Sequence, residues 1–533
     1  MNRNRIRGSR VLLAVAAVAL VARPAQAKPL TPPDFDEGWY VVTMEDPATG
    51  RSQQAGYMHN VLRRAGDEMH ARNEMKFQIR RGQAVIKIAV TQTSRETLEG
   101  RPLAFGNRIA FGTAPQTIRG TIDKGVLTLI SEQFGVETKK TYPFDPEIRF
   151  SWGLMLQQHE HGLKPGTTFD SKIYDPSLRM DGPVDVTVTV HGKETVEVLG
   201  RRRRLTRITT SMKLDKGAGG ALGAPGGGAS PLGGRQIDSD TWVDDDLIPV
   251  VMTMDLGIMK VKLYKTTKTD AMKQGAPPEM FLTTFIPIDR RIGNDAKRVK
   301  LRLTLKKNAK GPLPTLPDTA MQTYRRVSDR EAIVTLRRID WHKIRKVEAV
   351  PETFPADMKV YRTASAVCDS GDRKIKRLAR RAVRGKKTPA DMADALRKFV
   401  TRYITDKNMD VGFATASDVA RNRSGDCTEH GVLLAAVARA AGLPARGVGG
   451  IVEIPSGYPT PNGGSSFGYH MWTQVYIGDQ WVDIDAALRQ TDCAPNHLAV
   501  SLMPLGEEGM IDFVMKLIPL LGQLRIEVIE VER

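Results

Sequence analysis

The sequence is poor in cysteine, with only Cys368, Cys427 and Cys493 among 533 residues. So few cysteines exclude a disulfide-stapled scaffold. An odd number also leaves at least one thiol unpaired if the protein is exported. Aromatic residues make up only 6% of the chain, whereas 41% hydrophobic and 26% charged residues are ordinary for a globular protein. Because the chain is longer than one hydrophobic core organises, we expect two to four domains.

The N-terminal apolar run is too short for a membrane anchor. Val11–Val21 falls well below the ~20 residues that a spanning helix needs. It follows an arginine-rich start and precedes Ala25-Gln26-Ala27, a small-x-small cleavage pattern. These features are typical of a secretory signal peptide over residues 1–27, cleaved before Lys28. We therefore expect an exported protein, periplasmic or extracellular.

Charge is unbalanced toward the positive sign, with 79 Lys and Arg against 60 Asp and Glu and a formal net charge of +19. A basic protein attracts anionic partners. Export favours envelope polymers or lipid headgroups, through peripheral contact, over nucleic acid, which we do not expect as a partner. The densest basic run, Arg201–Arg204, lies between two strand-like segments, where it is interpreted as a solvated hairpin end.

Short strand patterns fill the chain from Trp39 to about Lys273, for example Val184–Val190. Recurrent short strands with few helical patterns predict an antiparallel sheet or half-barrel. The Gly, Ala and Pro residues between Lys216 and Arg235 predict a mobile loop. A phosphate-binding loop would need a preceding strand and a following helix with Lys-Ser/Thr, and these are missing.

Helical periodicity begins after residue 370. Ile375, Leu378 and Ala379 share one face of a predicted helix. Thr388 followed by Pro389 is typical of an N-cap and first helical position, so a second helix is predicted to start there.

The segment SGDCTEHG at residues 424–431, followed by VLLAAVARAAGLPARGV, carries the first chemical signal. Asp426 can cap a helix, and Glu429 three residues later completes a capping box. Gly442 is expected to end that helix. Cys427 therefore lies in the first turn, where free N–H groups and the helix dipole favour a thiolate.

A predicted hairpin supplies the second signal. The strand Tyr469–Ile477 is followed by Gly478-Asp479, interpreted as a type II′ turn, and by a second strand. The resulting register puts His470 and Asp485 on the same face as diagonal neighbours, within side-chain reach. A thiol nucleophile needs a base and a group that orients the base. His470 and Asp485 fit those roles, and Asp483 on the same face is a weaker candidate because it lies further from His470.

These two segments, TASDVARNRSGDCTEHGVLLAAVARAAGLPARGV and GYHMWTQVYIGDQWVDID, resemble bacterial members of the transglutaminase-like superfamily. The resemblance extends over roughly Asp369–Val500. It implies a papain-like α+β fold and a triad of Cys427 as nucleophile, His470 as base and Asp485 as orienting group. The family includes peptidases, amidases and cross-linking enzymes, so the resemblance implies acyl transfer from an amide of a protein or peptide.

The same residues allow other assignments. His430, one turn beyond Cys427, is interpreted as a packing or supporting residue. Zinc binding by Cys427, His430 and His470 would lack a fourth ligand, so no metal and no cofactor are expected. The pair His159 and His161 is interpreted as part of a solvated loop. A disulfide between the two other cysteines stays open, as does an envelope binding or scaffolding role with a silent catalytic domain.

The expected fold is multi-domain α+β, with antiparallel β-rich N-terminal domains followed by a transglutaminase-like domain. The expected divisions are a signal peptide at 1–27, a β-rich domain at 28–275 with a mobile loop at 216–235, a small β module or linker at 276–345, and the transglutaminase-like catalytic domain at 346–533. A short helix at Met510–Leu521 and a strand at Leu524–Val531 are expected at its end.

Overall fold

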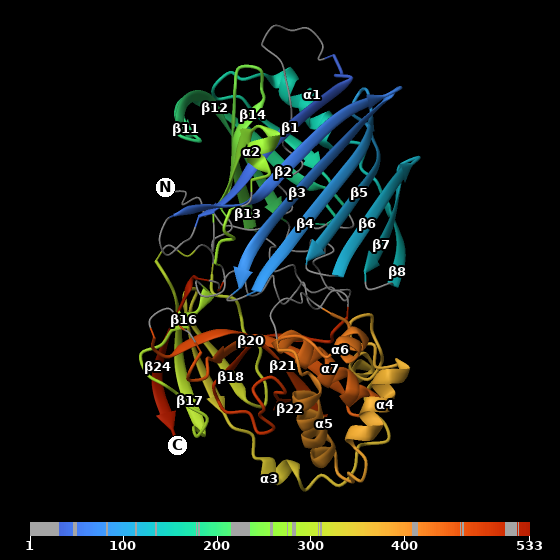
Figure 1. The fold of residues 1–533 in the computed structure, drawn as a ribbon, viewed down its shortest axis with the longest axis vertical. Helices are drawn as coiled ribbons and strands as arrows, with labels where there is room; N and C mark the ends of the chain where they lie inside the picture. The colour runs from blue at the N-terminus through green and yellow to red at the C-terminus, as the bar shows by residue number, and fades with distance from the viewer. Residues whose placement is uncertain are drawn as a thin grey trace. The chain divides into compact units, whose positions relative to one another are not determined.

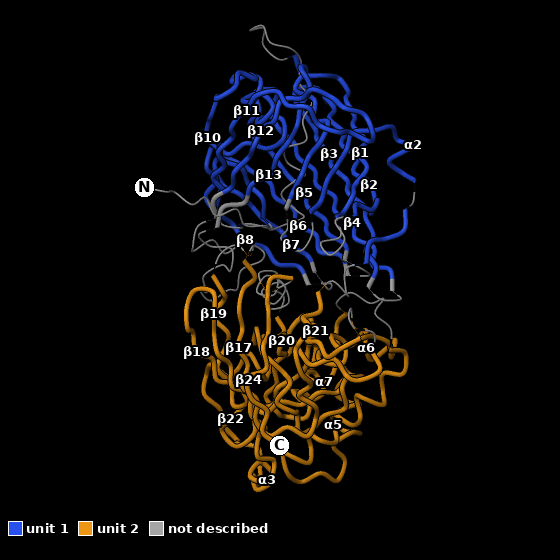
Figure 2. The backbone as a smooth tube through the Cα atoms, turned by 90° about the vertical axis from the view of Figure 1, so that its left-hand side faces the viewer, with its two compact units in different colours: residues 1–80, 85–111, 115–280 blue, residues 81–84, 112–114, 281–533 orange. Residues whose placement is uncertain are grey.

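The computed structural model divides into two compact units (Figure 2). The first comprises residues 1–80, 85–111 and 115–280, and the second comprises residues 81–84, 112–114 and 281–533. The structure describes residues 31–45, 51–81, 84–111, 114–133, 136–176, 179, 182–214, 235–255, 260–273, 275–279, 284–307, 309, 312–407, 414–458, 460, 463–506, 520 and 522–533. The predicted signal peptide, nearly all of the predicted Gly-rich loop and the predicted helix at Met510–Leu521, except Leu520, lie outside the described residues.

The first unit is built on a 15-stranded sheet in the order β8-β7-β6-β5-β4-β3-β2-β1-β15-β14-β13-β12-β11-β10-β9 (Figure 1). The neighbouring pairs whose register is defined are antiparallel, except that β9 runs parallel to β10. The strands are β1 (Phe35–Glu45), β2 (Ser52–Ala65), β3 (Glu68–Arg81), β4 (Ala84–Thr97), β5 (Pro102–Phe111), β6 (Ala114–Asp123), β7 (Val126–Gln133), β8 (Val136–Pro143), β9 (Ile148–Arg149), β10 (Thr168–Ile173), β11 (Val184–Val198), β12 (Arg201–Leu214), β13 (Arg235–Val243), β14 (Pro249–Asp255) and β15 (Lys260–Thr266).

Alternation along these strands creates the core of the first unit. In β1, Tyr40, Val42 and Met44 are buried on one face, and in β3 Met75 and Phe77 join them in one cluster. Successive side chains of a strand point to opposite faces, so every second residue faces the core. The antiparallel β-rich character predicted from sequence is confirmed.

Two local features of the first unit differ in detail from the sequence interpretation. Arg201–Arg204 is exposed, as expected of a hairpin end, but it forms the start of β12. The segment containing His159 and His161 was predicted to be a loop, and this is wrong. It forms the last turn of α1 (Ser151–His161).

Helix α1 depends on a distant carboxyl group for its N-terminus. Its N-cap residue, Phe150, offers no side-chain hydrogen bond. Instead Glu96 at the end of β4 accepts hydrogen bonds from the backbone N–H groups of Trp152 and Gly153, both at 2.8 Å. Glu96 is fully buried, and burial raises its pKa to about 7 despite these bonds. Local sequence around residue 150 gives no sign of such a cap. The first unit also contains the short helix α2 (Lys268–Ala271).

The second unit combines two sheets with helices. One sheet has the order β16-β21-β20-β23, with β22 paired to β21, and the other has the order β18-β19-β17-β24. Their strands are β16 (Ile286–Pro287), β17 (Arg298–Leu305), β18 (Gln322–Ser328), β19 (Glu331–Arg337), β20 (Ala445–Glu453), β21 (Ser466–Ile477), β22 (Gln480–Ile484), β23 (His497–Met503) and β24 (Leu524–Glu532). The helices are α3 (Trp341–Ile344), the 3-10 helix η3 (Ala356–Tyr361), α4 (Arg373–Ala382), α5 (Pro389–Tyr403), α6 (Ala416–Asn422) and α7 (Cys427–Ala440).

The four-stranded sheet joins distant parts of the chain. Strands β17 to β19 come from the segment expected to be a small β module or linker, and β17 pairs with β24 at the C-terminal end of the sequence. The domain limits expected from sequence stay predictions. The α+β class of the C-terminal part is confirmed.

Helix boundaries in the second unit follow the predicted capping residues. Thr388 accepts a hydrogen bond from the backbone N–H of Asp391, and α5 begins at Pro389. Helix α7 is buried from Glu429 to Arg439 and is the central helix of this unit. Among the described residues, no helix is both long and apolar enough to cross a membrane.

Candidate active site

Cys427 is the first residue of α7, and its position is fixed by the predicted capping box. The Asp426 side chain accepts a hydrogen bond from the backbone N–H of Thr428, and the Glu429 side chain accepts one from the N–H of Asp426 at 3.0 Å. Gly425 just before the cap has φ +144°, which side-chain-bearing residues rarely adopt. The thiol is half-buried, so it keeps a route to solvent.

Strand β21 carries His470 and is bonded to α7. The Thr473 hydroxyl of β21 donates a hydrogen bond to the backbone carbonyl of Gly431 in α7 at 3.0 Å. This bond fixes the strand against the helix one turn beyond Cys427. The Cys427 side chain interacts with that of His470, so the structure brings the predicted nucleophile and the predicted base together.

The hairpin register predicted from sequence is confirmed over the five pairs from Ile477↔Gln480 to Thr473↔Ile484. The predicted turn type is wrong. Gly478 has φ +56° and Asp479 has φ +62°, and positive φ at both central residues defines a type I′ turn. Such a turn matches the twist of the strands, and aspartate tolerates the left-handed conformation. Pairing stops at Ile484, and Asp485 exchanges backbone hydrogen bonds with Gln490 instead.

His470 and Asp485 form a buried pair. Nε2 of His470 lies 2.6 Å from Oδ2 of Asp485. Burial opposes the charged imidazole, but the Asp485 carboxylate and the Cys427 side chain outweigh it and raise the pKa of His470 to about 10. Burial likewise opposes the charged carboxylate, but the two histidines beside it hold the pKa of Asp485 well below its usual range. With Nε2 occupied, the ring nitrogen left to face the Cys427 thiol is Nδ1.

Asp485 is held by a third residue that sequence analysis did not find. His497, at the start of β23, is buried and places Nε2 3.2 Å from the same Oδ2 atom. Its Nδ1 lies 3.2 Å from the Ala494 carbonyl oxygen and 2.9 Å from Asn496 Oδ1. The other oxygen of Asp485, Oδ1, accepts the backbone N–H of Leu488 at 2.8 Å. Both carboxylate oxygens therefore have partners other than His470, and these partners fix the plane of the carboxylate.

Replacing His497 with phenylalanine is expected to slow alkylation of the Cys427 thiol by roughly 10- to 100-fold. A hydrogen bond to a charged group contributes about 1.5–3 kcal/mol, and each 1.4 kcal/mol is about tenfold in rate. Phenylalanine keeps a ring against Trp472 but removes the donor to Asp485. The measurement is the rate of Cys427 alkylation by iodoacetamide at matched thermal stability. His497→Gln, which retains an N–H, should recover most of the rate, and equal rates for the two variants would reduce His497 to a packing residue.

Two other candidates have different partners. Nδ1 of His430 bonds to the backbone carbonyl of Asp426 at 2.6 Å, and burial lowers the pKa of this histidine. Asp483 accepts hydrogen bonds from Trp472 Nε1 and from Gln474, and burial raises the pKa of its carboxyl group. Asp483 therefore anchors the strand beside the pair and does not contact His470 itself.

The remaining cysteines are not bonded to each other. Cys368 and Cys493 are both free and buried, so the disulfide left open by the sequence is not formed. Burial raises the pKa of the Cys368 thiol to about 11 and also raises that of Cys493. Cys427 is the most accessible of the three thiols.

One group among the described residues brings metal-binding atom types together. The ligand atoms of His470, Asp485 and His497 all lie within 4.8 Å of one another. Both Nε2 atoms already contact the same carboxylate oxygen, at 2.6 and 3.2 Å. These are hydrogen-bond distances, so the three residues form a hydrogen-bonded histidine–aspartate–histidine network. The chemistry proposed for this site uses no metal.

Comparisons with known proteins bear on this geometry. No curated protein matches the chain. A structure described as a candidate cysteine protease from Cytophaga hutchinsonii shares 16% identity over 44% of this chain and 86% of its own, with a TM-score of 0.31. A β-barrel-like protein of unknown function from Brucella abortus shares 15% over 47% and 98%, with a TM-score of 0.31. The periplasmic domain of TgpA from Pseudomonas aeruginosa shares 17% over 40% and 87%, with a TM-score of 0.22.

These structural similarities are low, and nothing below depends on them. The family model of the transglutaminase-like superfamily matches residues 376–486, a range that contains Cys427, His470 and Asp485. The match also spans α4 to α7 and the hairpin of β21 and β22. Residues 376–486 of this chain therefore belong to the transglutaminase-like superfamily.

Proposed function

We propose that the protein is a thiol enzyme that forms an acyl-enzyme on Cys427 from an amide substrate. One observation carries the proposal: the Cys427 side chain interacts with His470, whose Nε2 lies 2.6 Å from the buried Asp485 carboxylate. A nucleophile, a base and a group that orients the base are the parts that acyl transfer needs. The family match supports the same class of chemistry.

In the proposed reaction the thiol proton resides on His470, because the raised pKa of the ring favours the imidazolium form. The sulfur bonds to the carbonyl carbon of the amide, and the carbonyl electron pair moves to oxygen. The backbone N–H of Cys427, which has no carbonyl partner within the helix, is available to that oxygen. When the intermediate collapses, the C–N bond breaks, the leaving nitrogen takes the proton from His470, and a thioester remains.

The second half of the reaction releases the acyl group. Water or an amine attacks the thioester carbonyl and gives its proton to His470, and the sulfur leaves. With water the enzyme is a peptidase or amidase, and with an amine it is an acyltransferase of the transglutaminase type. We propose a peptide or isopeptide bond of a protein or envelope polymer as the substrate, met in the periplasm or outside the cell.

The first test is thiol labelling of the full chain. Limiting iodoacetamide followed by peptide mass spectrometry is expected to modify Cys427 and to spare Cys368 and Cys493, which are 0% and 1% exposed. Absence of enhanced reactivity at Cys427, relative to a free cysteine peptide, would favour an envelope scaffold with a silent domain.

The second test identifies the reaction. The protein is incubated with an envelope protein extract, either in ¹⁸O-labelled water or with a biotinylated primary amine. Hydrolysis places ¹⁸O in the new carboxyl group, whereas transfer attaches biotin to the acyl donor. The Cys427→Ala variant should do neither, and the Cys493→Ala variant should retain activity. Product formation by Cys427→Ala would remove Cys427 as the nucleophile.

A further inference from the structure

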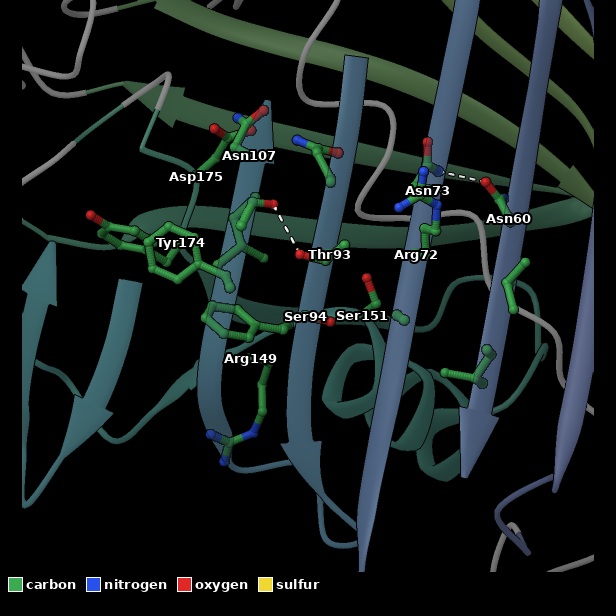
Figure 3. Close-up of a pocket in the computed structure, with 18 of the residues that line it drawn as sticks. Asn60, Arg72, Asn73, Thr93, Ser94, Asn107, Arg149, Ser151, Tyr174 and Asp175 are labelled. Atoms are coloured by element: carbon green, nitrogen blue, oxygen red, sulfur yellow. Dashed lines mark hydrogen bonds between the residues drawn. The ribbon is translucent and has the colours of Figure 1, made fainter. Parts of the chain in front are cut away.

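A cavity in the first unit lies on the inner face of strands β1 to β5. It has a volume of about 90 Å³ and is closed on its other side by residues near the start of α1 and the end of β10 (Figure 3). None of its lining residues belongs to the thiol site, which lies in the second unit. The cavity is therefore independent of the chemistry proposed above.

A row of amide side chains crosses the floor of this cavity. Asn60 of β2 pairs with Asn73 of β3, and Gln92 of β4 pairs with Asn107 of β5. Strands β3 and β4 are neighbours, and all four amides line the cavity. The four amides form a polar row, one residue from each of four consecutive strands, and Ser94 lies next to it on β4.

The apolar residues next to the row have a different role. Met58, Met75 and Val90 lie two positions along their strands from the amides and belong to the buried core cluster. Alternation along a strand puts residues two apart on the same face. On β2, β3 and β4, the residue that faces the core therefore has, two positions away on the same face, an amide that lines the cavity.

Two of these amides, Asn60 and Asn107, keep unpaired atoms. Asn73 Nδ2 donates to Asn60 Oδ1 at 2.5 Å. Asn107 is only 4% exposed, yet neither its amide nitrogen nor its amide oxygen has a hydrogen-bond partner among the described residues. The same holds for Nδ2 of Asn60. Buried polar side chains almost always have partners, so unpaired amides facing a cavity indicate a bound group that supplies them.

Aromatic rings form one wall of the cavity. The centroid of Phe105 lies 5.2 Å from that of Tyr174 and 5.8 Å from that of Phe150. Phe105 and Asn107 are two residues apart on β5, so their side chains lie on the same face of the sheet. A ligand in the cavity therefore meets apolar ring surface on one side and amide groups on the other (Figure 3).

Cationic side chains do not dominate the lining, which constrains the ligand. Arg72 is exposed and pairs with Glu74, so it does not offset Asp36 and Asp175. Arg149 donates hydrogen bonds to the backbone carbonyls of Pro146 and Ile148. An anionic headgroup would need a surplus of cations, and an acyl chain would leave the amides unpaired. Amides both donate and accept hydrogen bonds, as do hydroxyl groups. A neutral ring with several hydroxyl groups and an apolar face satisfies both walls at once.

We propose that this cavity binds one sugar ring of a neutral saccharide. Asn107, Gln92 and Asn60 bind its hydroxyl groups, and Phe105 and Tyr174 contact its apolar face.

The test uses the full chain on an array of neutral glycans that covers hexose and N-acetylhexosamine units, followed by calorimetric titration of the best ligand. Asn107→Leu, which removes both unpaired amide atoms at similar volume, is expected to weaken binding at least tenfold without lowering thermal stability. The matched control is Arg108→Gln, the exposed neighbour on the same strand, which should bind as the unchanged protein does.

Three outcomes would overturn the proposal. The first is an array without a binding neutral glycan, and the second is undiminished saccharide binding by Asn107→Leu. The third is displacement of the glycan by decanoate or lysophospholipid through the same residues, which would make the cavity a lipid site. Protein alkylated at Cys427 should bind the glycan unchanged, so failure of the proposed thiol chemistry would leave this test unaffected.

Discussion

Replacing Asp485 with asparagine is expected to lower amide turnover by about 10³- to 10⁴-fold, a loss typical of triads whose orienting carboxylate becomes an amide. In the native site the carboxylate accepts from Nε2 of His470 at 2.6 Å and favours the imidazolium form. An amide lacks the negative charge and can present an N–H to the ring instead. The imidazole then loses both its orientation and its affinity for the proton.

The same variant should change how thiol reactivity depends on pH. The native pKa of His470, about 10, keeps the ring protonated throughout neutral pH. Without the carboxylate only the Cys427 side chain is left to oppose the effect of burial, so the pKa of His470 falls. The thiolate then lacks the imidazolium that stabilises it, and its formation depends on pH. Alkylation of Cys427 should vary little from pH 6.5 to 8 in the native protein and rise about tenfold per pH unit in the variant.

Asp483→Asn is the matched control, because Asp483 is also buried and lies two residues before Asp485, in β22. Its partners are Trp472 and Gln474, so the pH profile of alkylation should keep its native shape. A native profile in Asp485→Asn, or the same altered profile in both variants, would contradict the role proposed for Asp485.

The parts of the site that sequence predicts are those set by neighbours along the chain. A capping box needs only Asp426 and Glu429 at a spacing of three, and both hydrogen bonds are present. The hairpin register follows from a two-residue turn and strict alternation, which together fix the His470 and Asp485 faces. The turn type was missed because Gly-Asp suits either primed turn, and only the backbone angles at Asp479 distinguish them.

The parts that sequence does not predict depend on pairing between distant segments. His497 reaches Asp485 because β23 pairs with β20, which in turn pairs with β21. No spacing rule connects residue 497 to the triad. In the first unit, β1 pairs with β15 more than two hundred residues later, and the amide row exists only once β2 to β5 are in register. Hydrophobic alternation predicts strands but does not select their partners.

Replacing Gly425 with alanine is expected to slow alkylation of Cys427 and amide turnover by about 100-fold. An added Cβ would lie 2.3 Å from both Cβ and Cγ of Glu429, the residue that closes the capping box. The φ of +144° adds strain of about 1–3 kcal/mol for a residue with a side chain. Relief requires the start of α7 to shift, and a displacement of about 1 Å at a reacting group can cost about 100-fold.

Gly442→Ala at the other end of α7 is the control. Gly442 also has positive φ, +93°, but an added Cβ would meet nothing within 4 Å. This variant should lose about 1–3 kcal/mol of stability through backbone strain alone and should keep the native alkylation rate. Urea unfolding and alkylation kinetics of the two variants separate a general loss of stability from displacement of the nucleophile. Equal alkylation rates in both variants would mean that the capping box does not position Cys427, because the two ends of the helix would then affect the thiol alike.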